Sequence, residues 1–170
     1  GIEAASQAGI DTIEHGTYLD EAAAREMAKN GTVLIPTLMA FKGVTERLGQ
    51  GVYTPVVEDK IRAVADVART FMGKARNWGV PIAFGTDAGV FEHGRNAGEF
   101  ALMRAQGMTD REALASATTM AARVLEMENE IGRLAPGYSA DIIAVDGDPL
   151  ADVTVLEDVD WVMVRGRVIE

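Results

Sequence analysis

Short β-rich runs alternate along the chain with longer stretches in which apolar residues recur every three or four positions. The first run, at 10–14, ends at His15-Gly16 and is followed by a helical pattern at 19–30. Asp20 is placed to cap that helix, and Gly31 stands just past its end. These signals predict a strand, a turn and a helix.

The same theme recurs twice. A second run at 32–38 contains Pro36, which favours the end of a strand or an irregular strand. A glycine-containing loop then leads to a predicted helix over 56–78, with apolar positions at i, i+3 and i+4. The third run, at 81–85, ends at Thr86-Asp87. Strands that alternate with helices indicate a parallel sheet and an α/β fold.

The pattern changes in the last quarter of the chain. A helix is expected from about 98 to 106, and Thr109 with Glu112 forms a capping box that opens another, broken near Thr118-Thr119 and ending near 127. Beyond 131, the spacing predicts a strand at 140–145 and a hairpin at 161–169 that turns at Arg165-Gly166. We therefore divide the chain near residue 130, into 1–130 and 131–170.

Composition narrows the class of protein. The 170 residues are 48% hydrophobic and 25% charged, which fits one globular domain, or one with a small appendage. The formal net charge is −10 and no Lys/Arg cluster stands out, which argues against nucleic acid as a partner. No apolar run approaches the ~20 residues of a membrane span, no signal peptide is visible and cysteine is absent, so we expect a cytoplasmic protein without disulfides.

Two polar residues stand out because each follows a predicted parallel strand. His15 and Asp87 lie at strand ends, the edge of α/β sheets where ligands bind, and both are suitable ligands for a divalent metal ion. Taken singly, a histidine after a strand is more often structural, and an aspartate in Gly-Thr-Asp-Ala-Gly is more often a turn former. The only other histidine is His93, so a three-histidine site within this chain is excluded.

Several short motifs occur in order along nearly the whole chain. They read GIDTIEHG at 9–16, PTL at 36–38, FGTDAG at 84–89, HG at 93–94, EAL at 112–114, TTMAA at 118–122, GRLAPG at 132–137 and ADII at 140–143. As a set they resemble the amidohydrolase superfamily, nearest to its Xaa-Pro dipeptidase-like and imidazolonepropionase-like branch.

The resemblance implies a fold and a site. The fold would be a partial TIM (β/α)8 barrel, with its last three βα units in 1–130, followed in 131–170 by a β-sandwich segment of the small composite β-domain. His15 would be the metal-binding histidine after barrel strand 6, and Asp87 the strand-8 aspartate that binds metal and carries the catalytic proton. His93, Arg95 and Asn96 would contact substrate, although charged loop residues are usually only solvated. The cofactor would be Zn²⁺, one or two ions per full-length site, with Mn²⁺ or Fe²⁺ left open, as is whether so short a chain holds the metal at all.

The rest of the family's ligand set has no counterpart in this sequence. The His-x-His pair after strand 1, the bridging lysine or glutamate after strand 4 and the strand-5 histidine are missing, as though the chain begins just after strand 5. We therefore expect a fragment of a metal-dependent hydrolase of C–N bonds, in dipeptides, N-acyl amino acids or cyclic amides, that is inactive alone and forms a homo-oligomer or joins the missing N-terminal part.

The alternative is a non-catalytic α/β fragment that self-associates. An upstream in-frame His-x-His would favour the hydrolase. A serine hydrolase is set aside because Ser6, Ser116 and Ser139 lack the Gly-x-Ser-x-Gly context.

Overall fold

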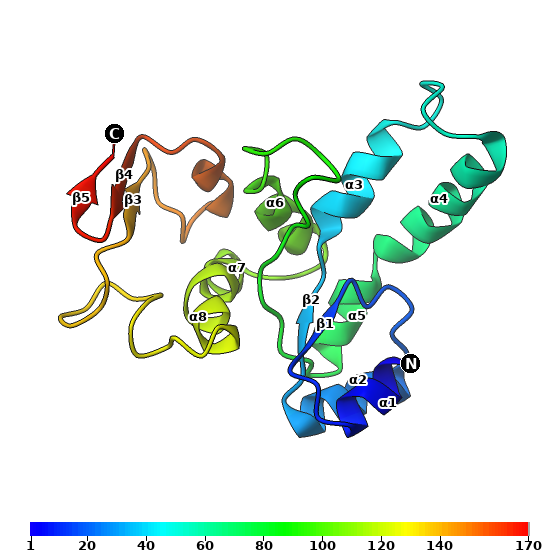
Figure 1. Cartoon of the computed structure of the whole chain (residues 1–170), viewed down its shortest axis with the longest axis horizontal. Coiled ribbons are helices and arrows are strands. Elements are labelled where there is room, and N and C mark those ends of the chain that lie inside the picture. The colour runs from blue at the N-terminus through cyan, green and yellow to red at the C-terminus, as the bar shows by residue number, and fades with distance from the viewer. Residues whose placement is uncertain (170) are drawn as a thin grey trace.

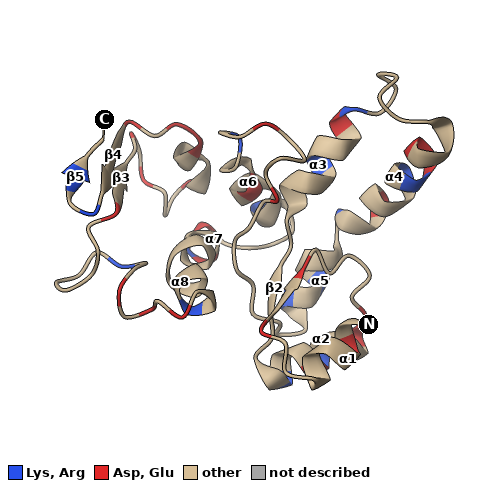
Figure 2. Cartoon of the chain, in the orientation of Figure 1, with Lys and Arg blue, Asp and Glu red and all other residues tan. Residues whose placement is uncertain are grey.

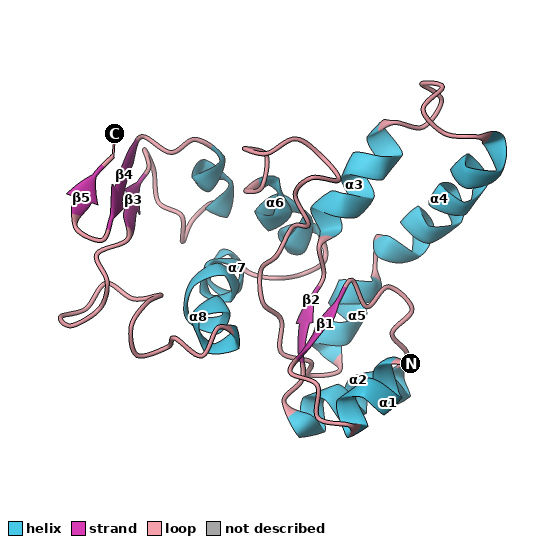
Figure 3. Ribbon diagram, in the orientation of Figure 1, coloured by secondary structure: helices cyan, strands magenta, loops and turns pink. Residues whose placement is uncertain are grey.

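The computed structural model describes residues 1–169 and shows a mixed α/β fold (Figures 1 and 3). Two short parallel strands lie among the N-terminal helices, and an antiparallel sheet lies at the opposite end of the molecule. The strands are β1 (Thr12–Glu14), β2 (Val33–Ile35), β3 (Ile142–Ala144), β4 (Trp161–Val164) and β5 (Arg167–Val168). The helices are α1 (Ile2–Gln7), α2 (Glu21–Asn30), α3 (Leu38–Glu46), α4 (Pro55–Ala68), α5 (Phe71–Asn77), α6 (Gly98–Ala105), α7 (Asp110–Ala115) and α8 (Ala121–Val124), with a π-helical turn η1 (Ser116–Met120) and a 3-10 turn η2 (Val153–Glu157).

The parallel arrangement predicted for the N-terminal part is confirmed. Strands β1 and β2 pair in parallel, with Ile13 opposite Leu34. The third predicted strand is extended beside β2 but is reduced to one parallel bridge between Leu34 and Ile82. It comes so close to β2 that a Cβ atom at Gly85 would overlap Cγ2 of Ile35. A glycine is therefore required where the third extended segment meets β2.

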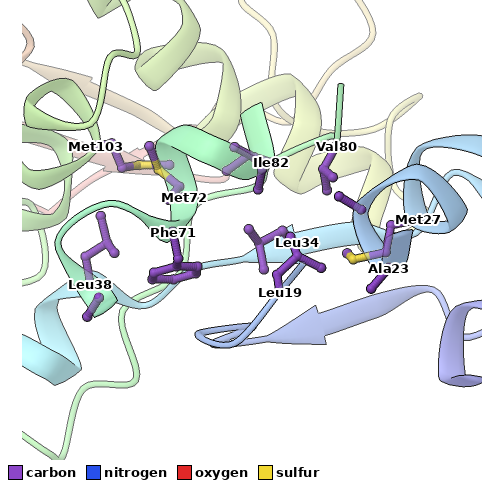
Figure 4. Close-up of a cluster of buried hydrophobic side chains, with 13 residues drawn as sticks. Leu19, Ala23, Met27, Leu34, Leu38, Phe71, Met72, Val80, Ile82 and Met103 are labelled. Atoms are coloured by element: carbon purple, nitrogen blue, oxygen red, sulfur yellow. The ribbon is translucent and has the colours of Figure 1, made fainter. Parts of the chain in front are cut away.

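The main core is built around β2 (Figure 4). Leu34 is fully buried, and it lies among side chains from the flanking helices and from the third extended segment. The cluster includes Leu19, Met27, Leu38, Phe71, Met72, Ile82 and Met103. Asp20 accepts a hydrogen bond from the Ala23 amide at 2.9 Å, and Gly31 adopts the left-handed conformation at the end of α2, as the sequence predicted.

The prediction of a single helix over 56–78 is wrong, because the helix is interrupted at Arg69-Thr70 and divided into α4 and α5. Helix α5 buries Phe71, Met72 and Ala75 in the main core, whereas α4 buries only Ala68 and extends beside α3, away from the core (Figure 1). The apolar spacing continues through the break, so it carries no sign of the change in direction.

Helices α1 and α3 were not predicted, and α3 occupies much of the expected glycine-rich loop. Gly43 lies inside α3 and faces the Phe91 backbone, where an added Cβ would lie 2.8 Å from Cβ of Phe91. This glycine serves close packing and does not mark a loop.

The C-terminal part follows the predicted local signals. Thr109 and Glu112 form the capping box of α7, and the break expected near Thr118 is the π-helical turn η1, although the helix ends at Val124 and not near 127. Strands β3, β4 and β5 form an antiparallel sheet, and the hairpin turns at Arg165-Gly166 with φ values of 49° and 76°.

A second apolar cluster joins this sheet region to the helices. Val153 and Leu156 of η2 pack with Phe100 of α6 and Ala113 of α7. Lys and Arg residues are spread over separate helices and loops (Figure 2). Within residues 1–169, every helix is too short or too polar to cross a membrane.

Candidate active site

Three consecutive strand ends share an uncommon backbone conformation. His15, Thr37 and Asp87 follow β1, β2 and the third extended segment, and their φ values are 64°, 50° and 54°. Non-glycine residues with positive φ are uncommon, and such strain concentrates at functional sites. Within residues 1–169, three of the five non-glycine residues with positive φ therefore lie at one edge of the sheet.

The side chains of His15 and Asp87, which both follow predicted strands, come together at this edge. Nε2 of His15 lies 4.0 Å from Oδ2 of Asp87, and the two side chains are 47% and 48% exposed. The separation is too long for a hydrogen bond. Zinc lies about 2.0–2.2 Å from nitrogen and oxygen ligands, so at this separation one ion contacts both atoms only when it lies nearly on the line between them.

Thr37 determines which ring nitrogen of His15 is free. The Thr37 hydroxyl donates its proton to the Pro36 carbonyl at 2.8 Å, and Oγ1 lies 2.5 Å from Nδ1 of His15. Because a carbonyl oxygen can only accept, both contacts of Thr37 are hydrogen bonds at the same time only when Nδ1 of His15 is the donor. Nε2 then keeps its lone pair and faces Asp87, which is the tautomer that a metal-binding histidine requires.

A buried carboxylate binds the backbone directly after Thr37. Glu99 of α6 is fully buried and accepts hydrogen bonds from the amides of Leu38 at 2.8 Å and Met39 at 2.6 Å, at the start of α3. Burial raises the pKa of Glu99 to about 7, while the two amide donors oppose the rise. Glu99 was not predicted as a site residue from the sequence. The signal was a glutamate on the same helical face as Phe100 and Met103.

An apolar cavity of about 420 Å³ opens beside the His15–Asp87 pair. The Phe41 ring stands edge-on to the His15 imidazole, with centroids 6.1 Å apart. The walls come mostly from α3 and α4, and they include Phe41, Val44, Val57, Lys60, Ile61 and Val64.

The three residues expected to contact substrate do not line this cavity. Arg95 is held by both carboxylate oxygens of Glu46, at 2.9 and 3.0 Å, and by Glu92 at 3.0 Å. These contacts raise the pKa of Arg95 and lower the pKa of Glu46. Asn96 donates to Oγ1 of Thr86 at 3.0 Å, next to Asp87, and His93 is exposed. Arg95 therefore ties its loop to α3, and Asn96 supports the residue before Asp87.

His15 and Asp87 are the donors this chain offers at the site. Within residues 1–169, no group of three or more His, Asp or Glu side chains is close enough to hold a metal ion. A hydrolytic zinc site uses about three protein ligands and water. The donor types fit such a metal, but this chain supplies only part of the set.

The sequence profile of the amidohydrolase family matches residues 1–169. The chain belongs to the amidohydrolase family. Over 168 residues it is 39% identical to an uncharacterized protein of Mycobacterium tuberculosis, a match that covers 94% of this chain and 42% of the relative. It is also 33% identical to ochratoxinase of Aspergillus niger over 161 residues, covering 93% of this chain and 33% of the enzyme.

Solved structures of amidohydrolases match the whole fold of this chain. A Xaa-Pro dipeptidase with methionine bound in its active site has a TM-score of 0.94 at 39% identity, over 99% of this chain and 42% of that protein. A prolidase in complex with N-methylphosphonate-L-proline has a TM-score of 0.90 at 35% identity, over 99% of this chain and 42% of that protein. This amidohydrolase chain thus spans less than half the length of the relatives it matches.

Proposed function

We propose that the chain carries two metal ligands, His15 and Asp87, of an amidohydrolase that cleaves a C–N bond in a dipeptide or N-acyl amino acid. The observation that supports this most strongly is the 4.0 Å approach of a histidine Nε2 and a carboxylate oxygen from two strand ends. The similarity to a Xaa-Pro dipeptidase, a prolidase and ochratoxinase supports an amide substrate.

We propose that 1–130 forms the last three βα units of a barrel and that 131–170 forms part of the small β-domain. The remaining metal ligands would then come from residues outside this chain. The chain covers 42% of the solved relatives, and the part of those proteins that it does not match leaves room for such ligands.

His15, Thr37 and Asp87 would have separate roles in the reaction. His15 would hold a divalent ion through Nε2, with Thr37 fixing its ring, and Asp87 would hold it through a carboxylate oxygen. Such an ion, most simply Zn²⁺, would polarise the scissile carbonyl and make water acidic enough to attack at neutral pH.

Asp87 would take the proton from the attacking water and pass it to the leaving nitrogen. This is general base catalysis followed by general acid catalysis. The half-exposed position of its carboxylate leaves room for water and substrate. The apolar wall of α3 and α4 would face the apolar part of the substrate, beside the scissile bond.

Metal binding by the 170-residue chain is the first test. In calorimetric titrations with Zn²⁺, we expect weak binding that is lost in His15→Asn and in Asp87→Asn. His93→Asn is the matched control, because it removes the other histidine from an exposed loop. Binding that survives both site variants, or that is lost with His93, would show that the ligands are misassigned.

A chimera tests the reaction itself. In the solved Xaa-Pro dipeptidase, residues 1–169 of this chain would replace the region that they match at a TM-score of 0.94. We expect metal-dependent dipeptide hydrolysis, and a fall in kcat of about 100- to 10,000-fold when Asp87→Asn is introduced. A folded, metal-loaded chimera with no hydrolysis, or one in which Asp87→Asn has no effect, would refute the proposed function.

A further inference from the structure

Glu99 is a buried ionisable residue that the proposed chemistry does not use. Its side chain is fully buried in α6, and each carboxylate oxygen accepts one backbone amide of α3. Burial of a carboxyl group is costly unless its oxygens are satisfied. Both oxygens are aimed at the beginning of one helix, and that helix begins directly after Thr37.

Thr37 occupies the N-cap position of α3 but does not act as a cap. A threonine at an N-cap ordinarily accepts a hydrogen bond from an amide of the first turn through its hydroxyl. Here, the Thr37 side chain makes no such bond, and its backbone is left-handed. Its hydroxyl is bonded to Nδ1 of His15 and to the Pro36 carbonyl.

The two observations explain one another. Glu99 satisfies the amides of Leu38 and Met39, and the Met39 amide is one that a capping threonine would otherwise serve. The Thr37 hydroxyl is thereby free to accept the proton of His15. Thr37 is itself only 3% exposed, so water has little access to replace either contact.

We propose that Glu99 is a positioning residue for the metal-binding histidine. By capping α3 in place of Thr37, it holds the Thr37 hydroxyl against Nδ1 of His15 and so keeps Nε2 unprotonated and facing Asp87. The proposal rests on the proposed function in one respect, that Nε2 of His15 is the metal ligand.

The tautomer of His15 is the direct readout, and it needs no metal. The chain has only two histidines, so the ring nitrogen NMR signals of His15 are assigned with one variant, His93→Asn, and His93 serves as an internal reference. In alkaline buffer, where imidazole rings are neutral, exposed histidines favour the proton on Nε2. We expect wild-type His15 to carry it on Nδ1 instead.

Glu99→Gln removes one of the two acceptor oxygens and puts an amide donor against a backbone donor. We expect His15 to revert toward the Nε2-protonated form and Zn²⁺ affinity to fall about 10- to 100-fold, as for other residues that orient a metal ligand. Thr37→Val should have the same effect directly, whereas Thr37→Ser should retain the wild-type tautomer.

Ser6→Ala is the matched control, since it removes a buried hydroxyl that is paired with Thr32 at 2.9 Å near the opposite end of β2. It should leave the His15 tautomer unchanged. A folded Glu99→Gln protein with the wild-type tautomer would overturn the proposal. If Glu99→Gln does not fold, Glu99→Asp, which keeps the charge on a shorter side chain, decides it by the same criterion.

Zinc addition separates this proposal from the proposed function. If Zn²⁺ shifts the Nε2 signal of wild-type His15 while Glu99→Gln leaves the tautomer intact, the positioning role is wrong and the metal site stands. If the tautomer reverts in Glu99→Gln but Zn²⁺ never affects His15, the metal site is wrong, and Glu99 sets the tautomer of a histidine that binds no metal.

Discussion

Glu99 should make the stability of the protein depend on pH in a direction opposite to that of most carboxylates. Its pKa is raised to about 7 in the folded protein, from an ordinary value of 4.5, chiefly because the side chain is buried. Between these two values, the folded state holds a proton that the unfolded state has lost. The contribution of Glu99 to stability is therefore fully present below about pH 4.5 and is lost as the pH rises through about 7.

The size of the effect follows from the displacement of the pKa. A change from 4.5 to about 7 corresponds to about 3 kcal/mol between acidic and alkaline conditions. Glu99→Gln has no proton to exchange at this position. Between about pH 5 and about pH 8, the free energy of unfolding of the wild type should thus fall by about 2.5 kcal/mol relative to that of Glu99→Gln.

Urea denaturation of both proteins at a series of pH values measures this difference. All other titrating groups are shared, so their contributions cancel in the comparison. Glu112 is a control of opposite sign: amide and hydroxyl donation from Thr109, together with Arg76, lowers its pKa, so its contribution is lost as the pH falls. Parallel profiles for wild type and Glu99→Gln would refute the reasoning. An increase in the free energy of unfolding of the wild type, relative to that of Glu99→Gln, as the pH rises would also refute it, because the amide donors would then outweigh burial.

Three further predictions concern activity, packing and assembly. With added Zn²⁺ or Mn²⁺, the 170-residue chain should hydrolyse Xaa-Pro dipeptides and N-acyl amino acids more slowly than about 1 s⁻¹, an ordinary enzymatic rate, because its ligand set is partial. Faster turnover would contradict this. Gly85→Ala should lower the free energy of unfolding by about 1–3 kcal/mol because the new methyl group would overlap Ile35, whereas Gly1→Ala, with open space around it, should have no effect; equal stability of the two variants would argue against the close approach. In sedimentation at micromolar concentration, the chain should be heavier than a monomer, because Ile143, Val164 and Val168 of the C-terminal sheet are 44–58% exposed; a compact monomer would contradict this.

Local signals in the sequence predicted local structure well. The Asp20 cap, the Gly31 stop, the Thr109–Glu112 capping box and the Arg165-Gly166 turn each depend on residues within a few positions of one another. Because these contacts form within one segment, the sequence alone specifies them.

Features that depend on distant partners could not be predicted in this way. Gly43 resembles a loop residue until Phe91 is placed against it, and the break at Arg69-Thr70 lies directly before Phe71, which packs in the core against distant residues. The same difference holds at the site. The topology of parallel strands brings His15 to Asp87, whereas the role of Thr37 depends on a hydrogen bond across β1 and β2.

Diffraction from crystals of the chain grown with Zn²⁺, recorded on both sides of the zinc absorption edge, tests the central claim most directly. We expect an anomalous peak about 2.0–2.2 Å from Nε2 of His15 and from a carboxylate oxygen of Asp87, with Nδ1 still bonded to Thr37. A peak that instead lies at His93 or on surface carboxylates, with the space between His15 and Asp87 filled by water alone, would contradict the account.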